Sequence, residues 1–246
     1  MTTPKRRRVY LMRHGSVTYF DTAGKPVLPE TVPLNEVGRA QASAAGEAFA
    51  ADGIRFDRVI VSGLPRTVET AQRVLAATGQ EVTIEHWPSL QEIRGGRLSD
   101  IARDDLKAAF TGVFDGVMPE QQRFLAGESV GELMDRVHPE IARLRADTDW
   151  DTVLMVLHGG VNCAILSHAL SGARLFMGGL SQTAGCINVL DVGNTPGDWV
   201  VRAVNYCPPM PLQNDTRVTV MEHLLSQYER GLPPGLTLGA PENRSR

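Results

Sequence analysis

A chain of 246 residues with 42% hydrophobic and 22% charged residues has the composition of a folded globular protein, and its length suits a single α/β domain with a large core. The formal net charge of −3 argues against a large nucleic-acid footprint, and no apolar run approaches the roughly 18 residues of a membrane span. We therefore expect no nucleic acid and no membrane among its partners.

The N-terminal segment is basic and does not have the form of a secretory signal. Lys5 to Arg8 are followed by four apolar residues, whereas a signal needs an apolar stretch of roughly 7–15 residues. The three cysteines, Cys163, Cys186 and Cys207, are odd in number and lack metal-site or CxxC spacing. These features predict a basic tail leading into a strand, a reduced cytoplasmic protein, and cysteines that act as small core residues.

The first half of the chain alternates strands and helices. The patterns predict strands over residues 8–12, 57–62 and 81–87, and helices over 36–51 and 65–78. Asn35 suits the N-cap of the first helix, and Gly79 suits the end of the second. Residues 94–127 have a weaker pattern with several glycines, and we expect them to form a variable insertion or lid.

The second half opens on a capping box, Ser129-Val-Gly-Glu132, which predicts a helix toward residue 146 with a kink at Pro139. Residues 152–157 are almost uniformly apolar, as in a central strand buried on both faces. The remaining predicted elements are a helix over 160–171, strands over 186–192 and 199–204, a last helix over about 216–229, and a loose tail after Gly231.

Strands separated by helices predict an α/β three-layer sandwich, with a mostly parallel central sheet and helices on both faces. We expect one domain over residues 1–246, with a core over about 8–204 and a C-terminal extension over about 205–246. Ligands of such sheets bind at the carboxyl ends of the strands. Arg13-His14, Ser62 to Arg66, and His158 each follow a predicted strand, so these polar residues should meet at one edge.

The residue types at that edge suit a phosphate ester. Arginine presents a planar fork of donors that matches phosphate oxygens, so Arg13 and Arg66 would offset most of the charge of a monoester. Histidine accepts a phosphoryl group only when neutral, and flanking arginines favour the neutral form of His14. His158 would hold phosphoryl oxygens when protonated, and the helix that begins directly after it would point its N–H groups at the same anion.

The leaving oxygen needs a proton donor, and Glu92 is the best carboxylate because it follows the third predicted strand on the same edge. Glu69 and Glu128 are the other acidic candidates. Each site residue also has a structural interpretation: Arg66 could pair with Glu69 on a helix surface, and His158 could cap the following helix.

These segments together resemble, in the same order, the motifs of the histidine phosphatase superfamily, which includes phosphoglycerate mutases and many small phosphatases. The resemblance spans about residues 8–204. The similar segments are Leu11-Met-Arg-His-Gly15, the first helix segment from Leu34 to Ala42, the phosphate-binding segment from Ser62 to Ala71, the acid-bearing Leu90-Gln-Glu92, and Val156-Leu-His158-Gly-Gly160.

The resemblance implies a phosphoglycerate mutase-like fold and a two-step mechanism without a cofactor or a metal. His14 would attack phosphorus in line and form a phosphohistidine, while Arg13, Arg66 and His158 hold the phosphoryl oxygens. Glu92 would protonate the leaving group and then activate water. The arginines would supply the charge that a magnesium ion provides elsewhere.

The segment after Gly15 departs from the family pattern. Many members have Glu, Gln or Thr directly after this glycine and, a few residues later, an asparagine that helps to bind phosphate. Here the segment reads Ser16-Val-Thr-Tyr-Phe-Asp21, and no asparagine occurs before Asn35. One phosphate contact is therefore missing, and Ser16 or Thr18 is the candidate to replace it in substrate binding.

Three functions compete. The first is a phosphoric monoester hydrolase acting on a small-molecule phosphate ester. The second is a phosphoglycerate mutase; such mutases carry a longer segment around the acid, with a tyrosine that Ile93 to Arg97 lack, and this difference favours the phosphatase. The third is a non-catalytic module that binds a phosphate ligand, which the competent residues at all four motif positions argue against.

Other polar residues receive weaker predictions. The remaining histidines have no ligand spacing and are expected to be structural or exposed, and a homodimer stays open. The basic residues of the variable region would either contact an anionic substrate or form a solvated face; the residues concerned are Arg94, Arg97, Arg103 and Lys107.

Overall fold

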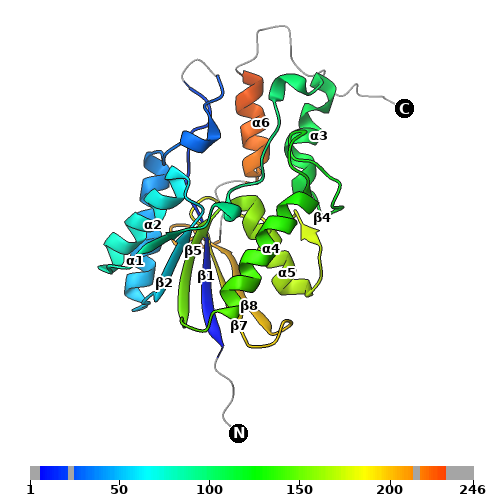
Figure 1. Ribbon diagram of the computed structural model, residues 1–246. Coiled ribbons are helices and arrows are strands. Elements are labelled where there is room, and N and C mark those ends of the chain that lie inside the picture. The colour runs from blue at the N-terminus through cyan, green and yellow to red at the C-terminus, as the bar shows by residue number, and fades with distance from the viewer. Residues whose placement is uncertain (1–5, 22–24, 213–216, 231–246) are drawn as a thin grey trace.

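The computed structural model describes residues 6–21, 25–212 and 217–230. These residues form a six-stranded sheet in the order β3-β2-β5-β1-β7-β8, flanked by helices on both faces (Figure 1). This arrangement confirms the predicted α/β three-layer sandwich. The strands are β1 (Arg7–Arg13), β2 (Arg58–Val61), β3 (Ile84–His86), β5 (Thr152–Leu157), β7 (Ile187–Val192) and β8 (Trp199–Tyr206).

Four neighbouring strands of the sheet, β3, β2, β5 and β1, are parallel, whereas β7 runs antiparallel to both β1 and β8. The antiparallel pair is a hairpin, because only six residues, 193–198, join β7 to β8 and a parallel connection needs a dozen or more. The carboxyl ends of β1, β2 and β5 consequently lie side by side at one edge of the sheet.

The alternation of side chains along β1 shows how the sheet separates two cores. Val9 and Leu11 face one layer, while Tyr10 and Met12 face the other. The first layer contains α4 (Val130–Ala146) and α5 (Gly159–Ser171). The second contains α1 (Glu36–Ala51) and α2 (Pro65–Thr78). β5 is buried on both faces, as its apolar sequence predicts.

The predicted helix ends are confirmed. The side chain of Asn35 accepts a hydrogen bond from Gly38 N at the start of α1, and Gly79 ends α2 in the left-handed conformation. Ser129 and Glu132 form the predicted capping box of α4. Pro139 lies inside α4, which continues past it to Ala146.

Short elements fill residues 88–118, which overlap the segment 94–127 whose weak pattern predicted an insertion. They comprise η2 (Pro88–Leu90), η3 (Leu98–Asp100), η4 (Arg103–Asp105), α3 (Leu106–Thr111), η5 (Gly112–Phe114) and β4 (Val117–Met118), which pairs with β6 (Phe176–Met177). The last helix, α6 (Val220–Arg230), begins about four residues later than predicted. The tail after Gly231 lies outside the described residues.

Helix α6 packs on the insertion through a small apolar cluster that contains Leu106, Phe110 and Leu225. In Figure 1, α6 stands beside α3 and beyond the carboxyl ends of the central strands, opposite the segment that contains η1 (Pro29–Thr31). The insertion and the C-terminal extension therefore meet above the edge where the site residues were expected.

Two predictions about the termini and cysteines have clear outcomes. The basic run is not wholly a tail, because Arg7 and Arg8 belong to β1. All three cysteines are buried, and burial raises the pKa of Cys186 to about 12, so this thiol stays protonated at neutral pH. Within the described ranges, no helix is both long and apolar enough to cross a bilayer.

Candidate active site

Backbone hydrogen bonds fix the segment that leaves β1. Arg13 N donates to Cys186 O at 3.0 Å, and His14 N donates to Leu157 O at 3.0 Å. His14 O in turn accepts from Gly185 N at 3.1 Å. His14 therefore sits on a backbone held from both sides, at the carboxyl end of the central strands.

The turn after His14 depends on two glycines in close contact. A Cβ atom on Gly15 would lie 2.3 Å from Gly38 O, and one on Gly38 would lie 2.1 Å from Ser16 O. Any larger residue at either position would separate the loop from the first turn of α1. This contact explains why a glycine follows the histidine and why the first helix carries another near its start.

The ring of His14 is 2% exposed, and its hydrogen bonds define its tautomer. Nδ1 lies 2.7 Å from Gly15 O, and since a carbonyl only accepts, Nδ1 carries the proton. The Nε2 lone pair then accepts from Arg66 Nε at 3.3 Å. Burial, followed by the charges of Arg13 and Arg66, holds the pKa of His14 well below its usual value. His14 is thus a neutral imidazole whose Nε2 carries the lone pair.

The two arginines are anchored by carbonyl groups. Arg66, 2% exposed, donates to Pro29 O at 2.6 Å, and Arg13 donates to Gln182 O at 2.5 Å. Arg13 Nε is buried without a hydrogen-bond partner in the described residues. Because carbonyl oxygens carry no net charge, both guanidinium charges remain available to an anion.

The alternative in which Arg66 pairs with Glu69 is wrong. The Glu69 carboxylate instead accepts from Arg39 at 2.7 Å and from Arg73 at 3.4 Å. Arg66 lies on the first turn of α2, directed toward His14.

His158 is fully buried, with its ring centre 5.1 Å from that of His14. Its Nε2 lies 2.8 Å from Ser62 Oγ. Ser62 Oγ lies 3.1 Å from the hydroxyl of Thr67, which donates to Leu64 O at 2.8 Å. Because the Thr67 hydroxyl donates to a carbonyl, Thr67 must accept from Ser62, and Ser62 must accept from His158. The proton of His158 is therefore on Nε2.

This arrangement leaves His158 Nδ1 as the nitrogen without a proton, buried and without a partner in the described residues. Burial, then the neighbouring His14, Arg66 and Arg13, lower the pKa of His158 well below its usual value. The protonated His158 expected next to a phosphate is therefore not the form that this structure favours. An anion close to Nδ1 would have to bring the proton with it.

Glu92 reaches the site through backbone contacts. Its carboxylate accepts hydrogen bonds from Gly160 N at 3.1 Å and from Ile93 N at 2.9 Å. A Cβ atom on Gly160 would lie 2.8 Å from Glu92 Oε1, so the glycine allows this approach. The N-terminus of α5 was expected to direct its N–H groups at the anion, but Gly160 N is engaged by Glu92.

The other two acidic candidates have structural partners. Glu69 pairs with arginines on α1 and α2, as described above. Glu128 accepts from Arg136 Nε at 2.7 Å and from Arg94 N at 2.9 Å. By contrast, Glu92 forms no ion pair within the described ranges, so it is the carboxylate left free for chemistry among the three.

Sequence reasoning missed the residues that hold these groups in place. Arg136, on α4, donates to the carbonyl oxygens of Ser89, Gln91 and Glu92 at 2.6–3.0 Å, and so fixes the acid-bearing loop. Gln182 exchanges side-chain amide hydrogen bonds with Asn188 at 2.8 and 3.0 Å, deep in the core beside the carbonyl that binds Arg13. Neither residue belongs to one of the motifs, and the sequence alone does not indicate these contacts.

The other residues predicted to contact substrate stay predictions. The hydroxyls of Ser16 and Thr18 each accept from Asn35 Nδ2 at 3.3 Å. Arg94, Arg97 and Lys107 are exposed.

Two further histidines, His138 and His168, pack against each other at 5.1 Å between α4 and α5. Among the residues with described positions, no group of three or more His, Cys, Asp or Glu side chains could hold a metal ion.

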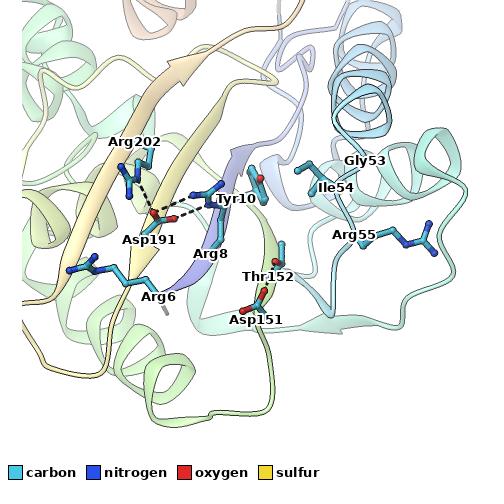
Figure 2. A pocket seen from close by; sticks show the side chains of 10 residues that line it. All are labelled: Arg6, Arg8, Tyr10, Gly53, Ile54, Arg55, Asp151, Thr152, Asp191 and Arg202. Atoms are coloured by element: carbon cyan, nitrogen blue, oxygen red, sulfur yellow. Dashed lines mark hydrogen bonds and ion pairs between the residues drawn. The ribbon is translucent and has the colours of Figure 1, made fainter. Parts of the chain in front are cut away.

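A cavity of about 410 Å³ lies at the opposite edge of the sheet (Figure 2). It also contains arginines, but Arg8 and Arg202 both donate to Asp191, and Arg6 donates to Asp198. The carboxylates there neutralise most of the positive charge. None of the predicted site residues lines this cavity, so its size does not make it the catalytic centre.

The candidate active site thus combines a buried, neutral histidine between two arginines with a second histidine and a carboxylate close by. The chain belongs to the histidine phosphatase superfamily (branch 1), whose family model matches residues 9–206.

Several relatives are similar over most of this region. A probable phosphoglycerate mutase, GpmB, of Salmonella paratyphi A is 32% identical over 160 residues, which are 62% of this chain and 69% of the relative. A chicken 6-phosphofructo-2-kinase/fructose-2,6-bisphosphatase is 29% identical over 67% of this chain, but the match spans only 33% of that larger protein.

Solved structures share the fold. A mycobacterial glucosyl-3-phosphoglycerate phosphatase superposes with a TM-score of 0.62 at 23% identity, over 81% of this chain and 98% of that chain. An alpha-ribazole phosphatase from Shigella flexneri has a TM-score of 0.60 at 22% identity, over 80% and 96% of the two chains. The phosphoglycerate mutase-like fold predicted from the motifs is thereby confirmed.

Proposed function

We propose that the protein is a metal-independent phosphatase that hydrolyses a small-molecule phosphomonoester through a phosphohistidine on His14. One observation carries this proposal. The neutral Nε2 of His14 lies in a buried site with two nitrogens that have no hydrogen-bond partner in the described part of the chain, Arg13 Nε and His158 Nδ1. Buried polar atoms are normally satisfied: a tetrahedral oxyanion would accept a hydrogen bond from Arg13 Nε directly, and from His158 Nδ1 once that nitrogen has taken up a proton.

In the first step, the lone pair of His14 Nε2 forms a bond to phosphorus while the ester P–O bond breaks. The leaving oxygen takes a proton from the carboxyl group of Glu92. In the second step, the Glu92 carboxylate removes a proton from water, the water oxygen attacks phosphorus, and the N–P bond breaks. Arg13, Arg66 and His158 offset the charge on the phosphoryl oxygens throughout.

The decisive experiment is to trap the intermediate. We expect the protein to hydrolyse an aryl phosphate in the presence of EDTA, and to retain ³²P from labelled substrate after an alkaline quench, which preserves phosphohistidine. His14→Ala should abolish both signals. His223→Ala, which alters an exposed histidine on α6, is the matched control and should change neither.

Two results would contradict the mechanism. Turnover that requires a divalent metal would show that the arginines do not supply the necessary charge. If the wild-type protein turns over substrate without retaining label, and His14→Ala keeps full activity, the reaction does not pass through a phosphohistidine on His14.

A mutase remains the second candidate because the similar Salmonella protein carries that name. The chain should then isomerise phosphoglycerates when primed with bisphosphoglycerate. Isomerisation faster than phosphate release would replace the hydrolase proposal. A binding module would bind phosphate and show no turnover on a broad panel of esters.

A further inference from the structure

The loop after β1 brings into the site a side chain that the motifs did not single out. Tyr19 lies in the segment that departs from the family pattern. Its side chain is mostly buried, and the centre of its ring is 6.0 Å from Cζ of Arg66. The phenol therefore lies close to the guanidinium group that the proposed mechanism assigns to phosphate.

The backbone around Tyr19 is tied down on both sides. Tyr19 O accepts from Val27 N at 2.8 Å, and the bridge between Phe20 and Pro26 lies directly beside this bond. The same loop supplies Pro29 O, which accepts from Arg66. Tyr19 and Arg66 are thus held in one unit, so the ring is positioned before a substrate arrives.

The next residue, Phe20, is held by a different part of the molecule. Its ring centre is 6.3 Å from that of Tyr228 on α6, which in turn lies 5.9 Å from Phe110 of the insertion. The C-terminal helix therefore holds the neighbouring side chain, while Tyr19 lies on the site.

The pKa of the Tyr19 hydroxyl is affected by burial and by the charged groups of the site. Burial raises its pKa, while the charges of Arg66 and Arg13 act to lower it and that of Glu92 acts to raise it. With its pKa above the usual value, the phenol keeps its proton at neutral pH and is able to donate a hydrogen bond. Among described residues, no side chain makes a hydrogen bond to this hydroxyl.

The hydroxyl oxygens of Ser16 and Thr18, by contrast, already have a partner in this structure. Both accept from Asn35 Nδ2, and Ser16 N donates to Gln41 Oε1 at 2.8 Å. The family makes this phosphate contact through an asparagine; among the described residues of the loop, Tyr19 has the hydroxyl that makes no hydrogen bond and a ring that lies against Arg66. We propose that the Tyr19 hydroxyl donates a hydrogen bond to a phosphoryl oxygen of the substrate and replaces that asparagine.

This inference rests on the proposed function, since it assumes that His14 and Arg66 bind a phosphoryl group. Its test should measure the phosphoryl contact without a leaving group. Inorganic phosphate and orthovanadate are suitable probes, because neither carries an ester substituent. Their binding can be measured by calorimetry alongside kcat and KM for an aryl phosphate.

Tyr19→Phe removes the hydroxyl and keeps the ring. A hydrogen bond to a charged group contributes about 1.5–3 kcal/mol, so we expect roughly 10- to 100-fold weaker binding of both anions and a similar fall in kcat/KM. Tyr228→Phe deletes a hydroxyl from the neighbouring aromatic cluster and should leave binding and turnover unchanged. Thermal unfolding of both variants checks the fold, and binding is normalised to the folded fraction seen by circular dichroism.

The outcomes separate the two proposals. The inference is wrong if wild-type protein binds phosphate and turns over substrate, and Tyr19→Phe does both equally well. The ring would then only pack against the site, and the hydroxyl would not contact the phosphoryl group. In that case Tyr19→Leu, which removes the ring, should still weaken binding. If the wild-type protein neither binds these anions nor hydrolyses any ester, the proposed function fails and the inference falls with it.

Discussion

The central sheet has an amino edge, where the parallel strands begin, and a carboxyl edge, where they end. Arginines at these two edges have different partners. At the amino edge, Arg8 and Arg202 share the carboxylate of Asp191 at 2.8 Å, as the dashed lines in Figure 2 show. At the carboxyl edge, the hydrogen bonds of Arg13 and Arg66 within the described residues go to carbonyl oxygens and the His14 ring. Arginine paired with carboxylate stabilises the fold, whereas arginine paired with carbonyls keeps its charge for a ligand.

The carboxylates of the two edges differ in the same way. Asp191 accepts from two guanidinium groups. Glu92 accepts from two backbone N–H groups and is in no ion pair within the described residues. Neutral donors orient Glu92 without committing it to a permanent cation, which leaves it able to exchange protons with a substrate.

The largest expected effect comes from replacing an arginine of the carboxyl edge with alanine, with the same change at the amino edge as its control. Arg66→Ala should lower kcat/KM for an aryl phosphate by about 10³-fold, because a charged donor is lost from a buried site. Arg66→Lys should recover little, since an ammonium group cannot reproduce the planar fork. Steady-state kinetics provide the measurement.

The matched control is Arg202→Ala at the amino edge, which should leave kcat/KM within about twofold of wild type, as for other surface changes. Equal losses in the two variants would show that the two edges do not differ in function.

Glu92→Gln should lower kcat by about 10²-fold for alkyl phosphates, whose leaving oxygen needs a proton. The loss should be much smaller for aryl phosphates with acidic phenols, which leave without one. A plot of kcat against leaving-group pKa therefore becomes steeper in the variant. Asp191→Asn, the corresponding change at the other edge, should leave that slope unchanged; equal slopes in wild type and Glu92→Gln would remove Glu92 as the acid.

A smaller effect is expected in proton uptake. The pKa of His158 is low in the empty site, while a bound anion favours its protonated form. Binding of a phosphate dianion should therefore take up as much as one proton, at Nδ1, because Nε2–H is directed at Ser62. Calorimetry at about pH 8 in buffers of different ionisation enthalpy measures this uptake, since the dianion dominates there. His158→Gln should bind phosphate without it; equal uptake in both proteins would place the proton elsewhere.

The smallest effect concerns stability at the amino edge. Burial acts to raise the pKa of Asp191, but hydrogen bonds from Arg8 and Arg202 outweigh it and leave the pKa below its usual value. The ionised form therefore stabilises the fold above the unfolded-state pKa, and this contribution is lost as the pH falls through the lower folded-state pKa.

Asp191→Asn should reduce the free energy of unfolding by about 1–2 kcal/mol near neutral pH and by less in acid, because the arginine partners are partly exposed. Urea denaturation at several pH values provides the measurement. A loss that does not depend on pH would indicate packing instead of charge.

Most elements of the fold could be predicted because their causes are local. The apolar run of β5, the Asn35 cap and the Ser129 capping box depend on residues within one or two turns of the chain. The direction of β7 and β8 could not be predicted with the same ease, since it depends on a six-residue hairpin instead of a helical crossover. The start of α6 was misplaced although its cause is local: Glu222 N donates to Thr219 Oγ1 at 3.2 Å and Thr219 N donates to Glu222 at 2.7 Å, a capping box that the sequence analysis overlooked.

In the site, too, features with local causes could be predicted and features that depend on tertiary contacts could not. Arg13, His14, Arg66, Glu92 and His158 were predictable as a group, because each follows a strand or opens a helix at one edge of a parallel sheet. Their protonation was only partly predictable: burial is the largest influence on both histidine pKa values, and burial is a tertiary property. Ser16 and Thr18 were chosen for their hydroxyls, and only the structure shows that both accept a hydrogen bond from Asn35.

The sequence by itself determined the family, the order of the elements and the edge at which the site residues lie. Strand periodicity and motifs depend on residues that are close together in the chain, so they can be recognised without the structure. Only the tertiary structure decided which nitrogen of His14 is free, which carboxylate is unpaired and which side chain of the variable loop faces Arg66. Those properties depend on contacts between segments far apart in the chain, such as Tyr19 with Arg66 and Glu92 with Gly160.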